Sequence, residues 1–119
     1  MDKETLRGIN SFDLIVAADV FVYFGSLEAI LNTFATLSNT GSHLIFSTEL
    51  ATPDEAPLGW RLLGSGRFAH TKEHAIQAGK SAGYELLVYQ EIVPRMEKGE
   101  PVHGQLFAFQ YAENQDQEL

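Results

Sequence analysis

The fold of this chain is decided by one stretch, Phe12-Asp13-Leu14-Ile15-Val16-Ala17-Ala18-Asp19. An almost continuous apolar run with β-branched residues predicts a strand, and a run without a polar face predicts burial on both faces, as in parallel sheets. The acidic Asp19 stands where this strand should end. The stretch therefore indicates an α/β fold.

The next residues carry a helix pattern and then a strand pattern. Apolar residues at i, i+3, i+4 and i+7 predict an amphipathic helix over 27–38, with Ser26 as its N-cap. Gly41 lies in a polar stretch that is typical of the end of a helix, and residues 43–49 predict a second strand. Strand, helix and strand with short connections form a βαβ unit, whose crossover should be right-handed.

A long loop and a second helix are expected next. Residues 51–69 are rich in proline and glycine and predict a loop, and loops of this length are often functional. Thr71 is placed to cap a helix that continues to about residue 82, where Gly83 ends it. The apolar positions of this helix are mostly small, which favours close packing on a sheet.

Two strands, over 84–93 and 104–111, complete the pattern and are separated by a turn region over 94–103. They should be antiparallel neighbours or near neighbours. The order is then β-α-β-α-β-β, with three parallel strands and one antiparallel strand. We expect one domain over 1–112 and a frayed acidic tail over 113–119.

Composition narrows the class of function. Sixteen Asp and Glu against eight Lys and Arg give a net charge of −8, and residues 8–60 contain no Lys or Arg. Such a surface repels nucleic acid and makes an anionic substrate less favoured than a cationic acceptor or a partner. The chain has no cysteine, which excludes a disulfide scaffold and fits the cytoplasm, and no apolar run long enough to span a membrane.

Candidate site residues gather where the strands should end. Asp19 can accept hydrogen bonds from a ligand amine or hydroxyl, or it can cap local backbone N–H groups. Arg67 suits a carboxylate or a phosphate, and His70 suits a general base, although both can equally be ordinary loop residues. Tyr23 either packs against the fold or stacks on a ligand.

One short motif resembles a zinc site. His70-Thr71-Lys72-Glu73-His74 matches the H-x-x-E-H pattern, in which two histidines one helical turn apart hold the metal. His70 stands at the start of the expected helix, and no third ligand is indicated. We therefore expect no metal.

Four segments together resemble class I S-adenosylmethionine-dependent methyltransferases, and in particular those that occur with tetratricopeptide repeats. The first runs from Phe12 to Leu27 and resembles the fourth-strand motif of these enzymes; residues 41–49 resemble the fifth strand. The others are Gly66-Arg67-Phe68-Ala69-His70 and Arg95-Met96-Glu97-Lys98-Gly99-Glu100-Pro101-Val102-His103-Gly104. The resemblance extends over residues 12–111, which is nearly the whole chain.

The resemblance implies the C-terminal half of a Rossmann-like methyltransferase sheet, from strand four to strand seven. It places Ala18, Asp19, Val20 and Tyr23 at the methionine end of S-adenosylmethionine. As catalytic residues on the acceptor side it implies Asp19 again, together with Glu49, Arg67 and His70, without identifying a small-molecule or protein acceptor. The Gly-rich cofactor loop and the ribose and adenine contacts of the family belong to earlier strands, so the chain should be inactive alone.

Such a half fold has consequences for assembly. The family strand order 3-2-1-4-5-7-6 keeps these four strands together, with both crossover helices on one face and the strand over 14–18 at an open edge. Bare apolar surface favours a homodimer or pairing with a complementary N-terminal half. Three functions remain open: an enzyme completed by another chain, a non-catalytic homodimeric binding module, and a truncation without a function of its own.

Overall fold

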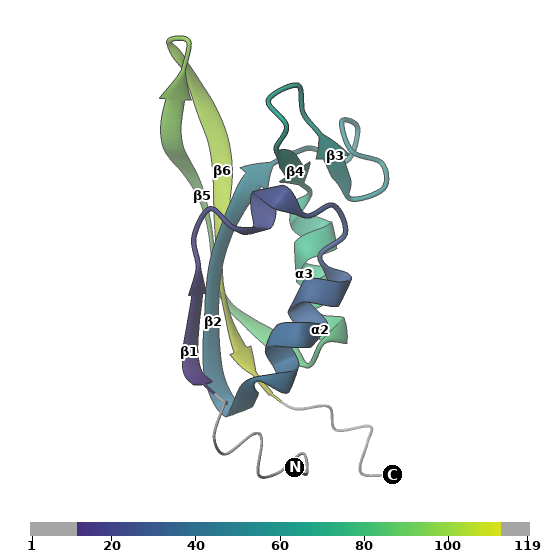
Figure 1. Cartoon of the computed structure of the whole chain (residues 1–119), viewed down its shortest axis with the longest axis vertical. Helices are drawn as coiled ribbons and strands as arrows, with labels where there is room; N and C mark the ends of the chain where they lie inside the picture. The colour runs from purple at the N-terminus through teal and green to yellow at the C-terminus, as the bar shows by residue number, and fades with distance from the viewer. Residues whose placement is uncertain (1–11, 113–119) are drawn as a thin grey trace.

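The computed structural model describes residues 12–112, so the expected tail over 113–119 lies outside the described residues. The elements follow one another along the chain with short connections (Figure 1). They are β1 (Phe12–Ala17), the 3-10 helix η1 (Phe21–Tyr23), α2 (Glu28–Thr36), β2 (Ser38–Leu50), β3 (Trp60–Leu62), β4 (Phe68–His70), α3 (Lys72–Ser81), β5 (Tyr84–Glu97) and β6 (Glu100–Tyr111).

The sheet is mixed and is organised around β2. This strand pairs in parallel with β1 and antiparallel with β6, and β6 pairs antiparallel with β5. Three of these four strands therefore run in one direction and β6 runs against them. The mixed α/β architecture expected from the sequence is confirmed.

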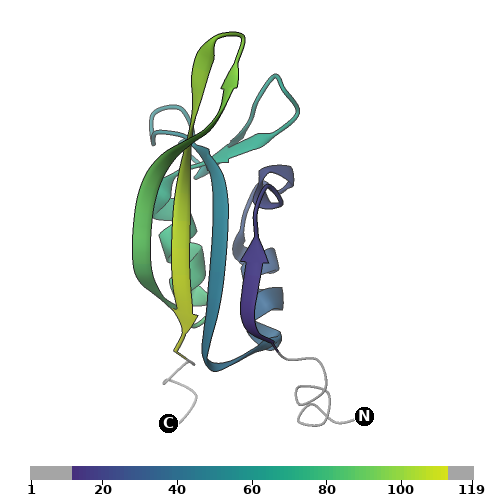
Figure 2. The same ribbon diagram turned by 90° about the vertical axis from the view of Figure 1, so that its left-hand side faces the viewer.

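Both helices pack on the same face of the sheet, and Figures 1 and 2 show this from two directions. The core between them is dominated by stacked aromatic rings. The ring of Phe46 on β2 lies 4.2 Å from that of Phe21 and 5.0 Å from that of Phe107, measured between centroids. Gly79 of α3 lies so close to Phe109 that a Cβ there would be 2.6 Å from the ring, which confirms the close packing expected from the small residues of this helix.

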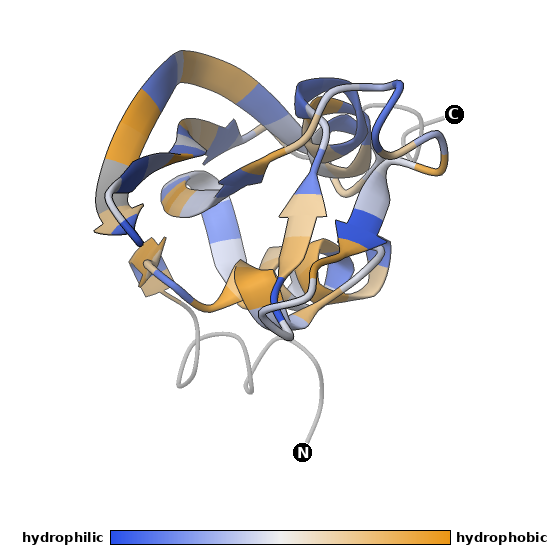
Figure 3. Cartoon of the chain, turned by 90° about the horizontal axis from the view of Figure 1, so that it is seen from above, coloured by the Kyte–Doolittle hydropathy of each residue, from blue (hydrophilic) through white to orange (hydrophobic). Residues whose placement is uncertain are grey.

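The prediction that β1 is buried on both faces is wrong. Ile15 and Ala17 face the core, whereas Leu14 and Val16 are 56% and 61% exposed, because no helix of the described chain covers their face. Within residues 12–112, β1 has one paired neighbour, β2, so its second edge is open. In Figure 3, which views the chain from above, β1 is coloured mostly orange, so the uncovered face of this strand is apolar as well.

Several element boundaries differ from those expected. Strand β2 begins at Ser38, directly after α2, and therefore includes Gly41 and the polar residues that predicted a stop. The hairpin of β5 and β6 turns only at Lys98 and Gly99, whose positive φ angles of 52° and 80° are those of a tight two-residue turn. The expected turn region over 94–103 is thus mostly strand.

The segment over 51–69 is not wholly a loop. Its end forms β4, which pairs in parallel with the last residues of β2, and β3 pairs antiparallel with β4. This small antiparallel unit extends the sheet beyond the point where β1 ends (Figure 1). It places the residues just before α3 beside the C-terminal end of β2.

The two helix caps differ in kind. Thr71 caps α3 as expected, since its Oγ1 accepts a hydrogen bond from the backbone N–H of His74 at 3.0 Å. Helix α2 is capped instead at Leu27, whose N–H donates to Nε2 of His74 at 3.0 Å. Ser26 accepts only a long bond of 3.3 Å from the N–H of Glu28, so its expected role as N-cap is corrected.

Candidate functional site

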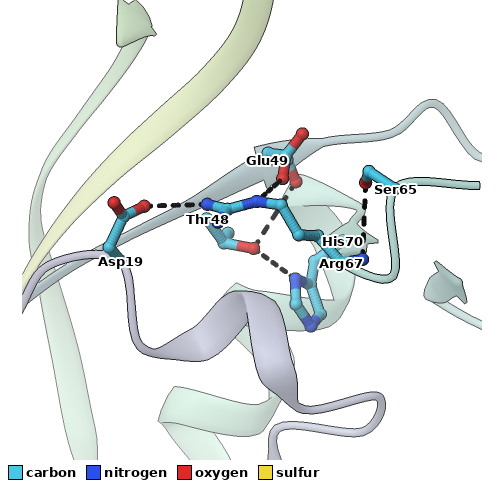
Figure 4. A network of polar contacts seen from close by, with 6 residues as sticks. All are labelled: Asp19, Thr48, Glu49, Ser65, Arg67 and His70. Carbon is cyan, nitrogen blue, oxygen red and sulfur yellow. Dashed lines mark hydrogen bonds and ion pairs between the residues drawn. The ribbon is translucent and has the colours of Figure 1, made fainter. Parts of the chain in front are cut away.

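Three charged side chains meet at the C-terminal end of β1 and β2 (Figure 4). Asp19 follows β1, Glu49 lies near the end of β2, and Arg67 directly precedes β4. Nη2 of Arg67 donates to Oδ1 of Asp19 at 2.8 Å, and Nε donates to Oε2 of Glu49 at 2.7 Å. The structure therefore brings together three of the four side chains expected to act in catalysis.

The burial of this triad is graded. The side chain of Glu49 is 7% exposed, that of Arg67 18% and that of Asp19 79%. The hydrogen bond to Glu49 is the largest cause that raises the pKa of Arg67, burial opposes it, and the bond to Asp19 adds to the rise. One cation thus neutralises a buried carboxylate and leaves the carboxylate of Asp19 largely in solvent.

Asp19 has an unusual backbone conformation. Its φ angle of 59° lies in the left-handed region, which aspartate tolerates better than most residues because its short side chain can hydrogen-bond locally. This conformation turns the chain sharply out of the sheet after β1 and leads it into η1. The carboxylate of Asp19 is thereby presented at the sheet edge, beside Arg67.

His70 is held between two elements. Its ring is fully buried, and Nε2 lies 2.7 Å from the carbonyl oxygen of Phe24 and 3.0 Å from that of Gly25. Two acceptors at Nε2 assign the ring proton to that nitrogen, so Nδ1 accepts a hydrogen bond from the hydroxyl of Thr48. Both ring nitrogens are therefore used within the fold.

Burial lowers the pKa of His70 to about 4. Desolvation is the largest cause, the two backbone carbonyls oppose it, and the neighbouring His74 lowers the pKa further. The ring is neutral at physiological pH and joins the loop after η1 to the end of β2. Its expected role as a general base stays a prediction, and this role requires the release of the hydroxyl of Thr48 from Nδ1.

Gln105 of β6 is a buried polar residue that the sequence did not single out. Its Nε2 donates to the carbonyl oxygen of His70 at 3.0 Å, and its Oε1 accepts from the hydroxyl of Tyr89 at 2.9 Å. Gln105 therefore fixes β4 against the hairpin of β5 and β6. The only signal in the sequence is a polar residue on a strand whose other core-facing residues are aromatic.

The residues expected to bind a cofactor lie together on the turn after β1. Ala18, Asp19 and Val20 are exposed there, and Tyr23 of η1 is 65% exposed. In η1 the neighbours Phe21 and Val22 are buried instead. The side chain of Tyr23 is thus available at the surface and is not part of the core.

The zinc motif is used for hydrogen bonding. Both nitrogens of His70 are engaged, and Nε2 of His74 accepts from the N–H of Leu27. Across residues 12–112 no three side chains of the types that ligate metals come together. The same residues include no helix that is both long and apolar enough to cross a membrane.

Comparison with solved structures identifies the fold; neither family models nor curated proteins give a match. A S-adenosylmethionine-dependent methyltransferase of Methanosarcina mazei superposes with a TM-score of 0.65 at 14% identity, over 88% of this chain and 61% of that one. Magnesium protoporphyrin IX methyltransferase of Synechocystis, solved with bound S-adenosylmethionine, gives 0.60 at 12% identity, over 85% and 39%. The cyclase SpnF gives 0.68 at 12% identity, over 88% and 52%.

These likenesses establish a methyltransferase-type fold and no more, because the identities are low and one of the similar structures is a cyclase. The chain spans between 39% and 61% of the length of these three structures. The ligands of those proteins are bound by longer chains, of which this chain matches only a part.

Proposed function

We propose that the chain is the acceptor-side half of a S-adenosylmethionine-dependent methyltransferase, catalytic only when another chain supplies the remaining cofactor contacts. The observation that carries the proposal is the mixed sheet of β1, β2, β6 and β5, which superposes on methyltransferases over most of this chain and about three fifths of the longer one.

The turn after β1 supplies the methionine end of the cofactor site in this proposal. Asp19 offers an exposed carboxylate for the ammonium group of S-adenosylmethionine, and Ala18, Val20 and Tyr23 offer surface beside it. S-Adenosylmethionine supplies the methyl group as a sulfonium when it is bound. The sequence contains no Gly-rich turn between a strand and a helix to hold the adenosine.

The completing chain is proposed to lie along β1. This strand has an open second edge, and its side chains Phe12, Leu14 and Val16 are 51%, 56% and 61% exposed. Open strand edges and exposed apolar faces are both features that association covers. A chain that continues the sheet at this edge would lie next to Asp19 as well.

A second function is favoured by the same surface. Two copies can pair through their β1 edges, which would give a non-catalytic homodimeric binding module on a methyltransferase-derived fold. Antiparallel pairing about a two-fold axis places Leu14 opposite Leu14 or Val16 of the other copy, and Asp13 opposite an apolar residue. No like charges then face each other.

Calorimetric titration of the isolated chain with S-adenosylmethionine tests the proposal. We expect no heat of binding with a dissociation constant below about 1 mM, which corresponds to about −4 kcal/mol. Micromolar binding would show a complete site within one chain and would contradict the need for a second one. A micromolar site that Asp19→Asn leaves unchanged would also contradict the assignment of the methionine end.

A further inference from the structure

A cavity of about 400 Å³ lies between the tip of the β5–β6 hairpin and the unit formed by β3 and β4. This volume is within the range of small-molecule sites. It exists because the hairpin extends past the end of β2, and because β4 extends the sheet on the other side of that strand (Figure 1). Its walls thus come from separate segments that the fold brings together.

The floor and sides of the cavity are apolar. Leu50 and Ala51 at the end of β2, Leu63 after β3, Ala69 of β4 and Val102 of β6 line it. Ala51 and Ala69 are buried and pack together with Leu63. An occupant therefore needs an apolar body to replace water at these side chains.

The charged groups of the cavity are mainly carboxylates. Glu49, Glu55 and Glu97 line it together with one guanidinium, that of Arg61. Carboxylates therefore outnumber guanidinium groups in the lining, and Glu49 is the carboxylate that is paired with Arg67. A cation is favoured in this field and an anion is repelled.

Thr52 orients the carboxylate of Glu55 at this cavity. Its Oε1 accepts hydrogen bonds from the backbone N–H of Thr52 at 2.9 Å and from the hydroxyl at 3.2 Å; these bonds lower its pKa, and the positive charge of Arg61 lowers it further. Thr52 in turn accepts from the N–H of Glu55 at 3.3 Å, so the turn is closed in both directions. No hydrogen bond to Oε2 of Glu55 occurs within the described residues.

We propose that this cavity binds an organic cation, an amine carried on an apolar body. The apolar part lies on Leu50, Ala51 and Val102, and the ammonium group lies at Oε2 of Glu55. Glu49 lines the cavity and also contacts Arg67 in the triad, so the bound molecule ends beside that site. That the molecule is the methyl acceptor rests on the proposed function; that the cavity binds it does not.

Tryptamine and indole-3-propionate are matched probes, because they share the ring and nearly the same chain length and differ in the sign of the charge. Titrations of the ¹⁵N-labelled chain, without S-adenosylmethionine, should show tryptamine shifting the amides of Ala51, Thr52 and Val102. We expect indole-3-propionate to bind at least about tenfold more weakly. Glu55→Gln removes the charge that the ammonium group contacts, so this variant should weaken tryptamine binding about tenfold or more.

Glu85→Gln is the matched control, since Glu85 is an exposed acid near the start of β5, away from the hairpin tip. It should leave the affinity for tryptamine unchanged. The proposal is overturned if tryptamine causes no localised shifts at about 10 mM, if both probes bind equally, or if Glu55→Gln has no effect. Binding of tryptamine here, with failure of the cofactor experiments, would keep the cavity site and reject the methyltransferase proposal.

Discussion

Arg67 and Asp19 are 48 residues apart in the sequence, and a hydrogen bond of 2.8 Å joins Nη2 of the first to Oδ1 of the second. This ion pair connects the turn after β1 to the start of β4 across the end of β2. Arg67 also holds the buried Glu49, so one guanidinium organises the three strand ends at the candidate site. The ion pair of Arg67 with Glu49 is buried and the one with Asp19 is exposed, so the two pairs differ in their contribution to stability.

Removal of Arg67 should destabilise the fold. Arg67→Met leaves the carboxylate of Glu49 buried without its cation, and breaking a buried ion pair in this way costs about 3 kcal/mol or more. Asp19→Asn disturbs only the exposed part of the triad and should cost less than about 1 kcal/mol. Urea denaturation of both variants measures the difference, and equal losses would contradict the proposed division.

Stability should fall as the pH is lowered from about 6.5. The folded-state pKa of His70 is about 4, below its ordinary value of 6.5, so the unfolded chain binds the proton first. The stabilisation is complete above about pH 6.5 and is lost towards pH 4, with a slope of up to about 1.4 kcal/mol per pH unit. Burial lowers the pKa of His74 as well, which adds to the slope.

Denaturant titrations between pH 7.5 and 5 test this dependence above the range where most carboxylates titrate. His70→Gln should be less stable at neutral pH but should show a shallower slope. The exposed His103 provides the control, because His103→Gln should keep the slope of the unmodified chain. An unchanged slope in His70→Gln would mean that His70 is not the buried neutral group.

Gly79 should not tolerate alanine although it lies within a helix. A Cβ would be 2.6 Å from Cε1 of Phe109, so the gain of about 1 kcal/mol in helix propensity is outweighed by overpacking of about 1–3 kcal/mol. Gly64→Ala is the comparison, since no heavy atom lies within 4 Å of the added methyl group. Thermal unfolding should show a lower midpoint for the first variant only; a stabilised Gly79→Ala would refute the close packing.

The open edge of β1 should make the chain associate. Light scattering after size exclusion is expected to give a mass above the 13.2 kDa of one chain at about 100 μM. Leu14→Thr with Val16→Thr places β-branched residues, which favour strands, at both positions and removes apolar surface, so this double variant should be monomeric. A monomeric unmodified chain at that concentration would argue against self-association through β1.

The main elements were predictable because their signals are local. The apolar runs of β1 and β2 and the helical spacing after Leu27 identify the βαβ unit, and Thr71 caps α3 as its type and position suggest. The far part of the hairpin was missed because residues 94–103 contain two prolines and little apolar pattern. Strand pairing stabilises this part, and pairing is not encoded in hydrophobic periodicity.

The sequence predicted which residues form the candidate site, but it did not predict the contacts between them. Asp19 and Glu49 were identified from their place at strand ends, and Arg67 from the expected long loop. Their ion pairs depend on β4, which is three residues long and follows a segment rich in glycine and proline. For His70 the residue type suggested a general base, whereas its environment is decided by tertiary burial. For Gln105 the sequence shows only a polar residue on an otherwise apolar strand face, which does not reveal its hydrogen bonds to His70 and Tyr89.

In the proposed function, this chain supplies the methionine end of a cofactor site and another chain supplies the remaining contacts. Titration of the ¹⁵N-labelled chain with S-adenosylhomocysteine, which shares the amino-acid end of the cofactor, tests it most directly. We expect weak binding, with a dissociation constant of about 1 mM or more, and shifts confined to Ala18, Asp19, Val20 and Tyr23. Micromolar affinity, or the absence of shifts at these residues at about 10 mM, would contradict the claim.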